Sequence, residues 1–344
     1  EQDSIYFNSG AAQPSRGDWE NIHIKSSQNC DDATSRVVSF QYCNINYGGG
    51  NGYYGVIFDE SAFSERDHTN CIAQLPFVNV LNSRVTNSAD KLIFSVNSKI
   101  HVENTLLSGY NEYPLNLDNT NAKIISNQII WDGGGEWSPL FYISLYNNGS
   151  NKSRKVEIKN NFFKTKKAVG RLYNEQNESS HKDSGIITGN SFTSFEQIYY
   201  FYIRTWYNHY TLMEKKIFVV EDDIDRSSSL FTLQSNDESI IRNNTIKRVQ
   251  SAFNHYSNAK TTIENNIVVD AYSIFNPSGS ASSSIIQNNI FYKYDNFIYN
   301  NNQNFFPIGF GDILTVNSNA DSIDTYNNLF INPKFVPSDS TVLF

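Results

Sequence analysis

Short strings in which apolar and polar residues alternate recur along the chain, and asparagine follows each string. Residues 240–246 read IIRNNTI, and a similar string, IENNIV, occupies residues 263–268, at an interval of 22 residues. Such alternation predicts a strand with one buried face. Asparagine is typical of a tight bend, because it tolerates left-handed backbone angles. We therefore expect short strands and bends that repeat at a fixed interval.

The first asparagine of each string marks a series with a base interval of 21 to 23 residues. Intervals of 30 to 33 residues lie in the middle of the chain, and an interval of 39 lies at each end. Each interval of 39 leaves room for one further, degenerate repeat. The series comprises Cys43, Asn82, Asn104, Asn127, Asn160, Asn190, Asp222, Asn243, Asn265, Asn288 and Asn327, with Asp222 in the asparagine slot of the string VVEDDID.

A period near 22 residues fits one coil of a parallel β-helix, in which three short strands and their turns form a rung. Successive rungs stack about 4.8 Å apart through parallel-strand hydrogen bonds. The asparagine side chains of neighbouring bends are expected to bond to one another as an Asn ladder. A leucine-rich repeat has a similar period, but its leucine skeleton is absent. A β-sandwich imposes no asparagine at a fixed phase.

Three segments resemble a known superfamily. GDWENIHI at residues 17–24, with VVSFQYCNINYGGG after it, is similar to the opening segment of pectate-lyase-like proteins, and NNLFINPKFV at residues 327–336 is similar to their closing phrase. The chain resembles the right-handed parallel β-helix superfamily, and within it secreted and surface proteins of Bacteroidetes-type bacteria. The resemblance covers nearly the whole chain and is specific for fold. It is weak for function, because lyases, hydrolases, adhesins and stalks share this fold.

This resemblance implies an all-β, right-handed parallel β-helix of about 11–12 rungs, with an Asn ladder and mid-chain loop insertions. A single domain is expected over residues 1–344. Residues 1–36 would lead into the helix, residues 37–336 would form the rungs, and residues 337–344 would be a truncated tail. We expect the chain to belong to a longer protein or to have lost a cap. An extracellular or cell-surface location is also expected.

Composition narrows the expected partners. The chain has 344 residues, a net charge of -8 and a pI of about 5.3, so nothing favours nucleic-acid binding. No apolar stretch approaches the roughly 18 residues that span a membrane. The number of cysteines is odd and no CxxC pair occurs, which argues against zinc. Cys30, Cys43 and Cys71 are either buried thiols or include a Cys30–Cys71 disulfide.

Candidate binding residues lie in the long intervals, where residues 128–221 carry insertions. Insertions at neighbouring rungs emerge close together, and these are rich in aromatic residues and arginine. Aromatic rings stack on sugar faces, while arginine pairs with carboxylates. The alternative is that the aromatic side chains form a small core beneath their own loops. The candidate ligand-binding residues are Trp131, Trp137, Tyr142, Arg171, Tyr173, Tyr202, Arg204, Trp206 and Tyr207.

An enzyme would need acid–base groups. For a polysaccharide lyase, Arg204 and His209 are the candidate catalytic residues. For a glycosidase, Asp223 and Asp225 are candidate carboxylates, although the companion motifs of β-helix pectin hydrolases are absent. The same two aspartates are candidate Ca²⁺ ligands. A purely structural role for the EDDID segment is the third alternative, and no other cofactor is expected.

Three functional hypotheses therefore remain open. The first is a non-catalytic adhesin or scaffold, which presents an aromatic side face to a polysaccharide, a glycoprotein glycan, a protein partner or a neighbouring domain. The second is a polysaccharide lyase or glycoside hydrolase that acts on an acidic polysaccharide. The third is an inert spacer.

Overall fold

The computed structural model of the chain describes residues 4–25, 37–50, 55–60, 77–131, 141–145, 154–165, 170–174, 183–194, 201–205, 209–220, 229–235, 238–256, 260–277, 283–300, 303–305 and 322–331. Every regular element in these ranges is a β-strand, so the predicted all-β class is confirmed. None of these residues forms a helix long and apolar enough to cross a membrane.

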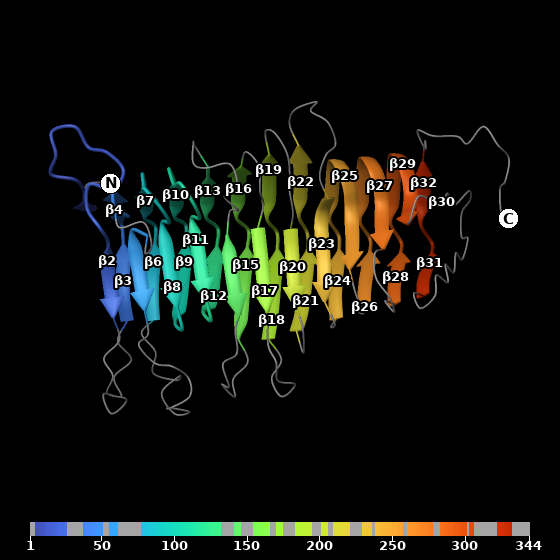
Figure 1. Ribbon diagram of the computed structural model, residues 1–344, viewed down its shortest axis with the longest axis horizontal. Coiled ribbons are helices and arrows are strands. Elements are labelled where there is room, and N and C mark those ends of the chain that lie inside the picture. The colour runs from blue at the N-terminus through green and yellow to red at the C-terminus, as the bar shows by residue number, and fades with distance from the viewer. Residues whose placement is uncertain are drawn as a thin grey trace.

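Strands pair in parallel with strands of the next coil, so the chain passes repeatedly through three faces. The coils follow one another along the long axis, from the blue N-terminal to the red C-terminal end of Figure 1. The first face contains β1 (Ile5–Phe7), β4 (Cys43–Asn46), β7 (Arg84–Thr86), β10 (Leu106–Ser108), β13 (Gln128–Ile130), β16 (Phe162–Thr165), β19 (Ser191–Ser194), β22 (Ile217–Val220) and β32 (Leu329–Ile331). The second face contains β2 (Ile22–Lys25), β5 (Ile57–Glu60), β8 (Ile93–Val96), β11 (Leu115–Asp118), β14 (Tyr142–Leu145), β17 (Gly170–Asn174), β20 (Phe201–Thr205) and β23 (Ser229–Ser235).

The third face is a separate 11-stranded parallel sheet, with one strand from each coil. Its strands are β3 (Val37–Gln41), β6 (Phe77–Leu81), β9 (Lys99–Glu103), β12 (Asn121–Ile125), β15 (Lys155–Lys159), β18 (Asp183–Thr188), β21 (His209–Glu214), β24 (Glu238–Arg242), β26 (Lys260–Glu264), β28 (Ser283–Gln287) and β31 (Ser322–Tyr326). This parallel, repeating arrangement is solenoid-like.

Three long strands join the first and second faces near the C-terminal end. They are β25 (Thr245–Tyr256), β27 (Ile267–Pro277) and β29 (Ile290–Asn300). The start of β25 pairs with β22 on the first face, and its later part pairs with β23 on the second. The two faces thereby form one 21-stranded sheet. The single antiparallel pairing among the described strands joins β29 to β30 (Gln303–Phe305).

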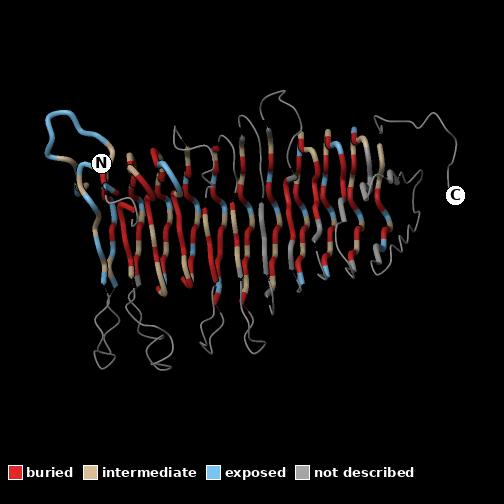
Figure 2. The backbone as a smooth tube through the Cα atoms, in the orientation of Figure 1, coloured by how far each residue is buried: buried red, intermediate tan, exposed pale blue. Residues whose placement is uncertain are grey.

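Apolar side chains at alternate positions fill the interior of the coils, and Figure 2 shows buried residues recurring along each coil. Equivalent side chains of successive coils lie over one another. Phe163, Phe192 and Phe218 form such a stack, with ring centroids 4.6 and 4.8 Å apart and nearly parallel planes. Full burial of one such ring contributes about 1.5–3 kcal/mol, and ring pairing contributes about 0.5–1.5 kcal/mol more.

Two adjacent residues form the tight bend between the third and first faces, and they have different roles. The first is exposed and has positive φ, as in Asn243 (φ 55°), and the second is buried, as in Asn244. The first positions are Tyr42, Asn82, Asn104, Ser126, Asn160, Gly189, Lys215, Asn243, Asn265, Asn288 and Asn327. The second positions are Cys43, Ser83, Thr105, Asn127, Asn161, Asn190, Lys216, Asn244, Asn266, Asn289 and Asn328.

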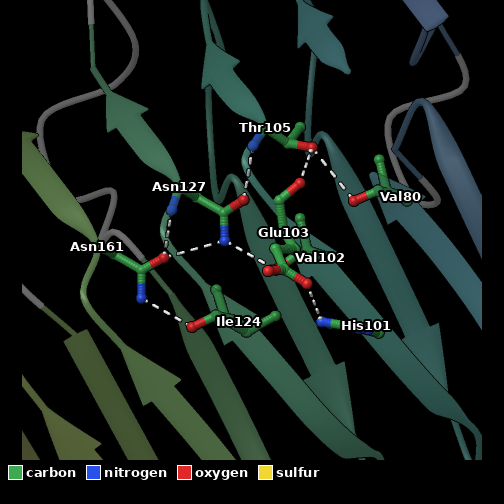
Figure 3. Close-up of polar contacts among 8 residues, drawn as sticks. All are labelled: Val80, His101, Val102, Glu103, Thr105, Ile124, Asn127 and Asn161. Carbon is green, nitrogen blue, oxygen red and sulfur yellow. Dashed lines mark hydrogen bonds and ion pairs between the residues drawn. The ribbon is translucent and has the colours of Figure 1, made fainter. Parts of the chain in front are cut away.

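Seven buried asparagines at second positions form what we call the asparagine column: Asn127, Asn161, Asn190, Asn244, Asn266, Asn289 and Asn328. Asn127 donates its backbone N–H and its Nδ2 to Oδ1 of Asn161, at 2.9 and 3.0 Å. Its Nδ2 also donates to the Val102 carbonyl at 2.9 Å (Figure 3). Within the column, each such set of bonds satisfies buried polar groups on two coils.

The sequence pattern assigns Asp222 to the asparagine slot, and that assignment is wrong. Lys215, with φ 55°, and Lys216 hold the two bend positions directly before β22. Asp222 follows β22 and lies outside the described residues. The residues that the pattern took for a strand before a bend belong to the strand after it.

In each of the two 39-residue intervals, the described elements on either side are direct neighbours. The backbone N–H of Cys43 donates to Oγ of Ser83, 40 residues away, at 3.0 Å. Asn289 donates to Oδ1 of Asn328, 39 residues away, at 2.9 Å. The two residues of each pair therefore lie on neighbouring coils, and the suggestion of a degenerate extra repeat at each end is wrong.

Candidate functional site

Five of the candidate binding residues lie on three neighbouring strands of the second face. Tyr142 on β14 is in register with Arg171 on β17, and Arg171 is in register with Tyr202 on β20. In a second row, Tyr173 on β17 is in register with Arg204 on β20. For Tyr202 and Arg204 the structure describes the backbone position alone.

Alternation along the strands directs the described members of this group outward. Ile143 and Leu172 are buried in the core, whereas Tyr142, Arg171 and Tyr173 are half-buried. The rings of Tyr142 and Tyr173 lie 5.3 Å apart between centroids, inclined at 38°. They therefore form a tilted pair on the outer side of the second face.

Tyr113 extends this group toward the preceding coil. Its ring centroid is 5.6 Å from that of Tyr142. Burial raises the pKa of the Tyr113 hydroxyl, and the positive charge of Arg171 opposes this rise. We call Tyr113, Tyr142, Arg171 and Tyr173 the aromatic patch. Arg171 forms no ion pair with any residue in the described ranges.

A charged triad borders the patch. Lys91 Nζ lies 2.8 Å from Glu112 Oε2 and 3.1 Å from Asp90 Oδ2. Burial alone would lower the pKa of Lys91, but bonding to Glu112 and Asp90 outweighs it and the pKa is raised. Burial raises the pKa of Asp90 to about 6 against the effect of Lys91. Lys91 is thus held as a cation beside two carboxyl groups.

Asp118, at the end of β11, is a further acidic group on this face. It is in register with Ser144, which is in register with Tyr173. Burial raises the pKa of the Asp118 carboxyl to about 6, and the charge of Lys91 opposes the rise. A carboxyl group that titrates near neutrality on a ring-bearing surface is a candidate acid–base group.

Two buried polar atoms beside the patch lack partners within the described part of the chain. They are Oδ1 of Asn116, which is in register with Tyr142, and Oγ of Ser144. Buried polar atoms are normally hydrogen-bonded.

The other candidate residues are distributed differently. Trp131 is half-buried and packs against the hydrophobic core, and its backbone N–H donates to the Lys164 carbonyl at 2.9 Å. His209 starts β21 on the third face, on a different face from Arg204. Its side chain is not described. Trp137, Trp206, Tyr207, Asp223 and Asp225 lie outside the described residues.

Some of the candidate metal ligands and cysteines lie outside the described ranges. Within them, no group of three or more His, Cys, Asp or Glu side chains is arranged to hold a metal ion. The Ca²⁺ hypothesis concerned Asp223 and Asp225, so it stays a prediction. Cys43 is a buried free thiol whose pKa is raised by burial. The Cys30–Cys71 disulfide also stays a prediction.

Sequence reasoning missed Lys91, Glu112, Tyr113 and Asp118. These residues lie in regular coils, whereas the aromatic and arginine residues that stand out in the sequence lie in the long intervals. One signal was available: the 22-residue period aligns Lys91 with Tyr113, just before strands of the second face. A charged or aromatic residue at this repeated position marks the border of the patch.

Comparison with known proteins adds no relative. No protein-family model, no curated protein and no solved structure matches the chain.

Proposed function

We propose that this chain is a right-handed parallel β-helix of the pectate-lyase-like type, from a secreted or cell-surface bacterial protein. In this proposal the asparagine column is the Asn ladder of the helix. The parallel pairing of strands on three faces supports the proposal, as do the bonds between asparagines on successive coils. The rigid stack serves as a scaffold whose second face binds a glycan.

One observation carries the proposed activity: two tyrosine rings 5.3 Å apart accompany Arg171, which has no ion-pair partner among the described residues. Tyrosine rings offer apolar faces to sugar rings, and a guanidinium binds a carboxylate in a bidentate manner. Half-burial fixes the tyrosines, which reduces the conformational entropy lost on binding. The ligand class that fits is an acidic polysaccharide or an acidic glycoprotein glycan.

The experiment is a glycan array followed by calorimetric titration of the best acidic oligosaccharide. Tyr142→Ala and Arg171→Gln are each expected to weaken binding about tenfold or more, equivalent to about 1.4 kcal/mol. Matched controls on other surfaces are Tyr272→Ala and Lys123→Gln, which should bind as the unmodified chain does. Equal affinity for all five proteins would contradict the proposal.

Asp118 favours the enzymatic alternative, a lyase or glycosidase acting on the same glycan. A carboxyl group with a pKa of about 6 exchanges protons at neutral pH, as acid–base catalysis requires. An assay for new unsaturated uronate ends and for new reducing ends decides between the two. Product formation that Asp118→Asn abolishes would establish an enzyme, and binding without product would establish the scaffold. An inert spacer would show neither.

A further inference from the structure

A groove of about 810 Å³ lies along the outside of the bend between the third and first faces, in the N-terminal coils. It is well separated in the chain topology from the aromatic patch, which lies on the second face. Its lining residues are Ser4, Tyr6, Tyr42, Cys43, Asn44, Asn82, Ser83, Arg84, Asn104, Thr105, Leu106, Ser126 and Gln128.

Two rows of side chains form the lining, and both rows run along the stack of coils. The first row consists of outward positions on β1, β4, β7, β10 and β13, which are in register: Tyr6, Asn44, Arg84, Leu106 and Gln128. The second row consists of exposed bend positions, Tyr42, Asn82, Asn104 and Ser126. Taken together, the two rows place one amide on each of four successive coils, Asn44, Asn82, Asn104 and Gln128, at the coil spacing of about 4.8 Å.

Three polar side chains of this groove have no hydrogen-bond partner among the described residues, whereas the hydroxyl groups of Ser83 and Thr105 are bonded to backbone carbonyls. Within the described ranges, Arg84, Asn104 and Gln128 form no side-chain hydrogen bond and no ion pair. Arg242, an arginine on the third face, is by contrast paired: its Nε lies 2.7 Å from Glu214 Oε2. Arg84 is consequently a cation without an ion-pair partner among the described residues, in a concave, amide-lined surface.

Aromatic side chains lie at the N-terminal end of the groove. Tyr6 is 65% exposed and Tyr42 is 56% exposed, the largest exposures of any tyrosine in the described residues. Exposed tyrosines offer stacking faces and hydroxyl groups at low conformational cost. The groove thus combines a stacking end, a central cation and an array of amides.

We infer that this groove binds an extended, anionic oligosaccharide segment in addition to any ligand of the aromatic patch. The spacing of about 4.8 Å between coils is close to the length of one pyranose unit in an extended chain. Successive amides can therefore meet successive sugars. Arg84 binds a carboxylate or sulfate, and Tyr6 and Tyr42 stack on the terminal rings.

A peptide is the less suitable occupant. Peptides that extend a sheet need a strand edge with free backbone groups. Here β4 already pairs with both β1 and β7, and β7 already pairs with both β4 and β10. Only side chains of these inner strands face the groove, which suits a ligand recognised through hydroxyl and acidic groups.

Titration calorimetry with the full chain tests the inference, using three probes of equal length: hexagalacturonate, a heparin-derived hexasaccharide and cellohexaose. We expect one or both anionic probes to bind. Arg84→Gln should reduce that affinity about tenfold, and Tyr6→Ala should also reduce it. The choice between uronate and sulfate follows from which anionic probe binds. Binding of cellohexaose as tight as the anionic probes would overturn the role of Arg84.

Controls separate the groove from the patch. Lys123→Gln removes an exposed cation from the third face and should leave affinity unchanged. Arg171→Gln should weaken binding at the patch about tenfold or more and leave affinity at the groove unchanged, whereas Arg84→Gln should do the reverse. If the patch does not bind a glycan, binding that depends on Arg84 and not on Arg171 can still be measured. The inference is overturned if Arg84→Gln and Tyr6→Ala, folded as judged by thermal unfolding, bind all probes as the unmodified chain does.

Discussion

The backbone N–H of Lys216 donates to Oδ1 of Asn244 at 3.3 Å, yet Lys216 has no side-chain amide to continue the asparagine column. Its Nζ lies 5.9 Å from the ring centroid of Phe218 and 5.8 Å from that of Phe231. The asparagine column is thereby divided into one part that ends at Asn190 and another that begins at Asn244. A buried lysine at this point is an apparent cost to stability.

Replacing this lysine should stabilise the protein. Burial lowers the pKa of Lys216 well below its usual value, and Glu214 opposes this only in part. Lys216→Asn removes the buried amine and supplies the missing amide between Asn190 and Asn244. We expect the free energy of unfolding to rise by about 1–3 kcal/mol, from restored hydrogen bonds and relieved desolvation. Denaturant titration at neutral pH measures it.

Lys216→Met is the matched control, because it keeps the aliphatic stem without the amine. In the unmodified chain the unfolded state binds this proton more tightly than the folded state. The contribution of Lys216 to the free energy of unfolding should therefore become more favourable as pH rises toward 10.5, the pKa of a lysine in the unfolded chain. Lys216→Met should remove this dependence of stability on pH. This account would be refuted if Lys216→Asn were less stable than the unmodified chain and if the stability of Lys216→Met changed with pH as that of the unmodified chain does.

The two bend positions should respond differently to alanine. Asn266 donates from Nδ2 to the Ile241 carbonyl and to Oδ1 of Asn289, each at 3.0 Å, and accepts from Asn244. Asn266→Ala leaves these buried groups without partners and should cost about 2–4 kcal/mol. Asn265→Ala affects only an exposed residue with φ 56° and should cost about 1 kcal/mol. Equal losses in urea unfolding would contradict the division of roles.

The sequence predicted the coils well, because strand alternation is fixed by covalent geometry. The two similar strings at residues 240–246 and 263–268 were expected to form strands with one buried face, and Ile241 and Ile263 within them are fully buried and in register. The bend was harder to assign. Asparagine occurs at both positions of the Asn243–Asn244 pair, so residue type alone does not show which one turns inward. For the same reason Lys216 went unrecognised.

The residues of the aromatic patch were identified from the sequence only in part. Aromatic and arginine content in the long intervals led to Tyr142, Arg171 and Tyr173, but these residues lie on strands of the second face. Lys91 and Asp118 lie in coils without long insertions. They lie beside the patch because the stacking of coils brings together residues distant in sequence. A search confined to insertions does not detect such residues.

A buried aspartate should make stability depend on pH. Asp59 is fully buried and accepts from Ser95 Oγ at 2.9 Å. Burial raises its pKa from 3.8 to about 6, although hydrogen bonds from Ser98 and Ser95 oppose this. The folded state therefore prefers the protonated form. Its contribution is most favourable below about pH 4 and is lost as pH rises through about 6.

Asp59→Asn should accordingly stabilise the protein at neutral pH and have little effect at pH 4. A shift of this size corresponds to at most about 3 kcal/mol at neutral pH. Thermal unfolding of both proteins across pH 4 to 8 measures the difference. Curves that run parallel over this whole range would show that Asp59 does not titrate as proposed.

Glycan binding at the aromatic patch should also depend on pH, because Asp118 loses its proton near neutrality. Its pKa is raised to about 6 by burial, and Lys91 is the cation that opposes the rise. Above about pH 6 the added negative charge repels an acidic ligand held by Arg171, so affinity should fall several-fold between pH 5 and pH 7.5. Asp118→Asn should flatten this profile at its high-affinity level, since the amide stays neutral. Calorimetric titration with hexagalacturonate at both pH values provides the test. The ligand carboxylates are ionised throughout this range, so a profile unaltered by Asp118→Asn would assign the dependence to another group.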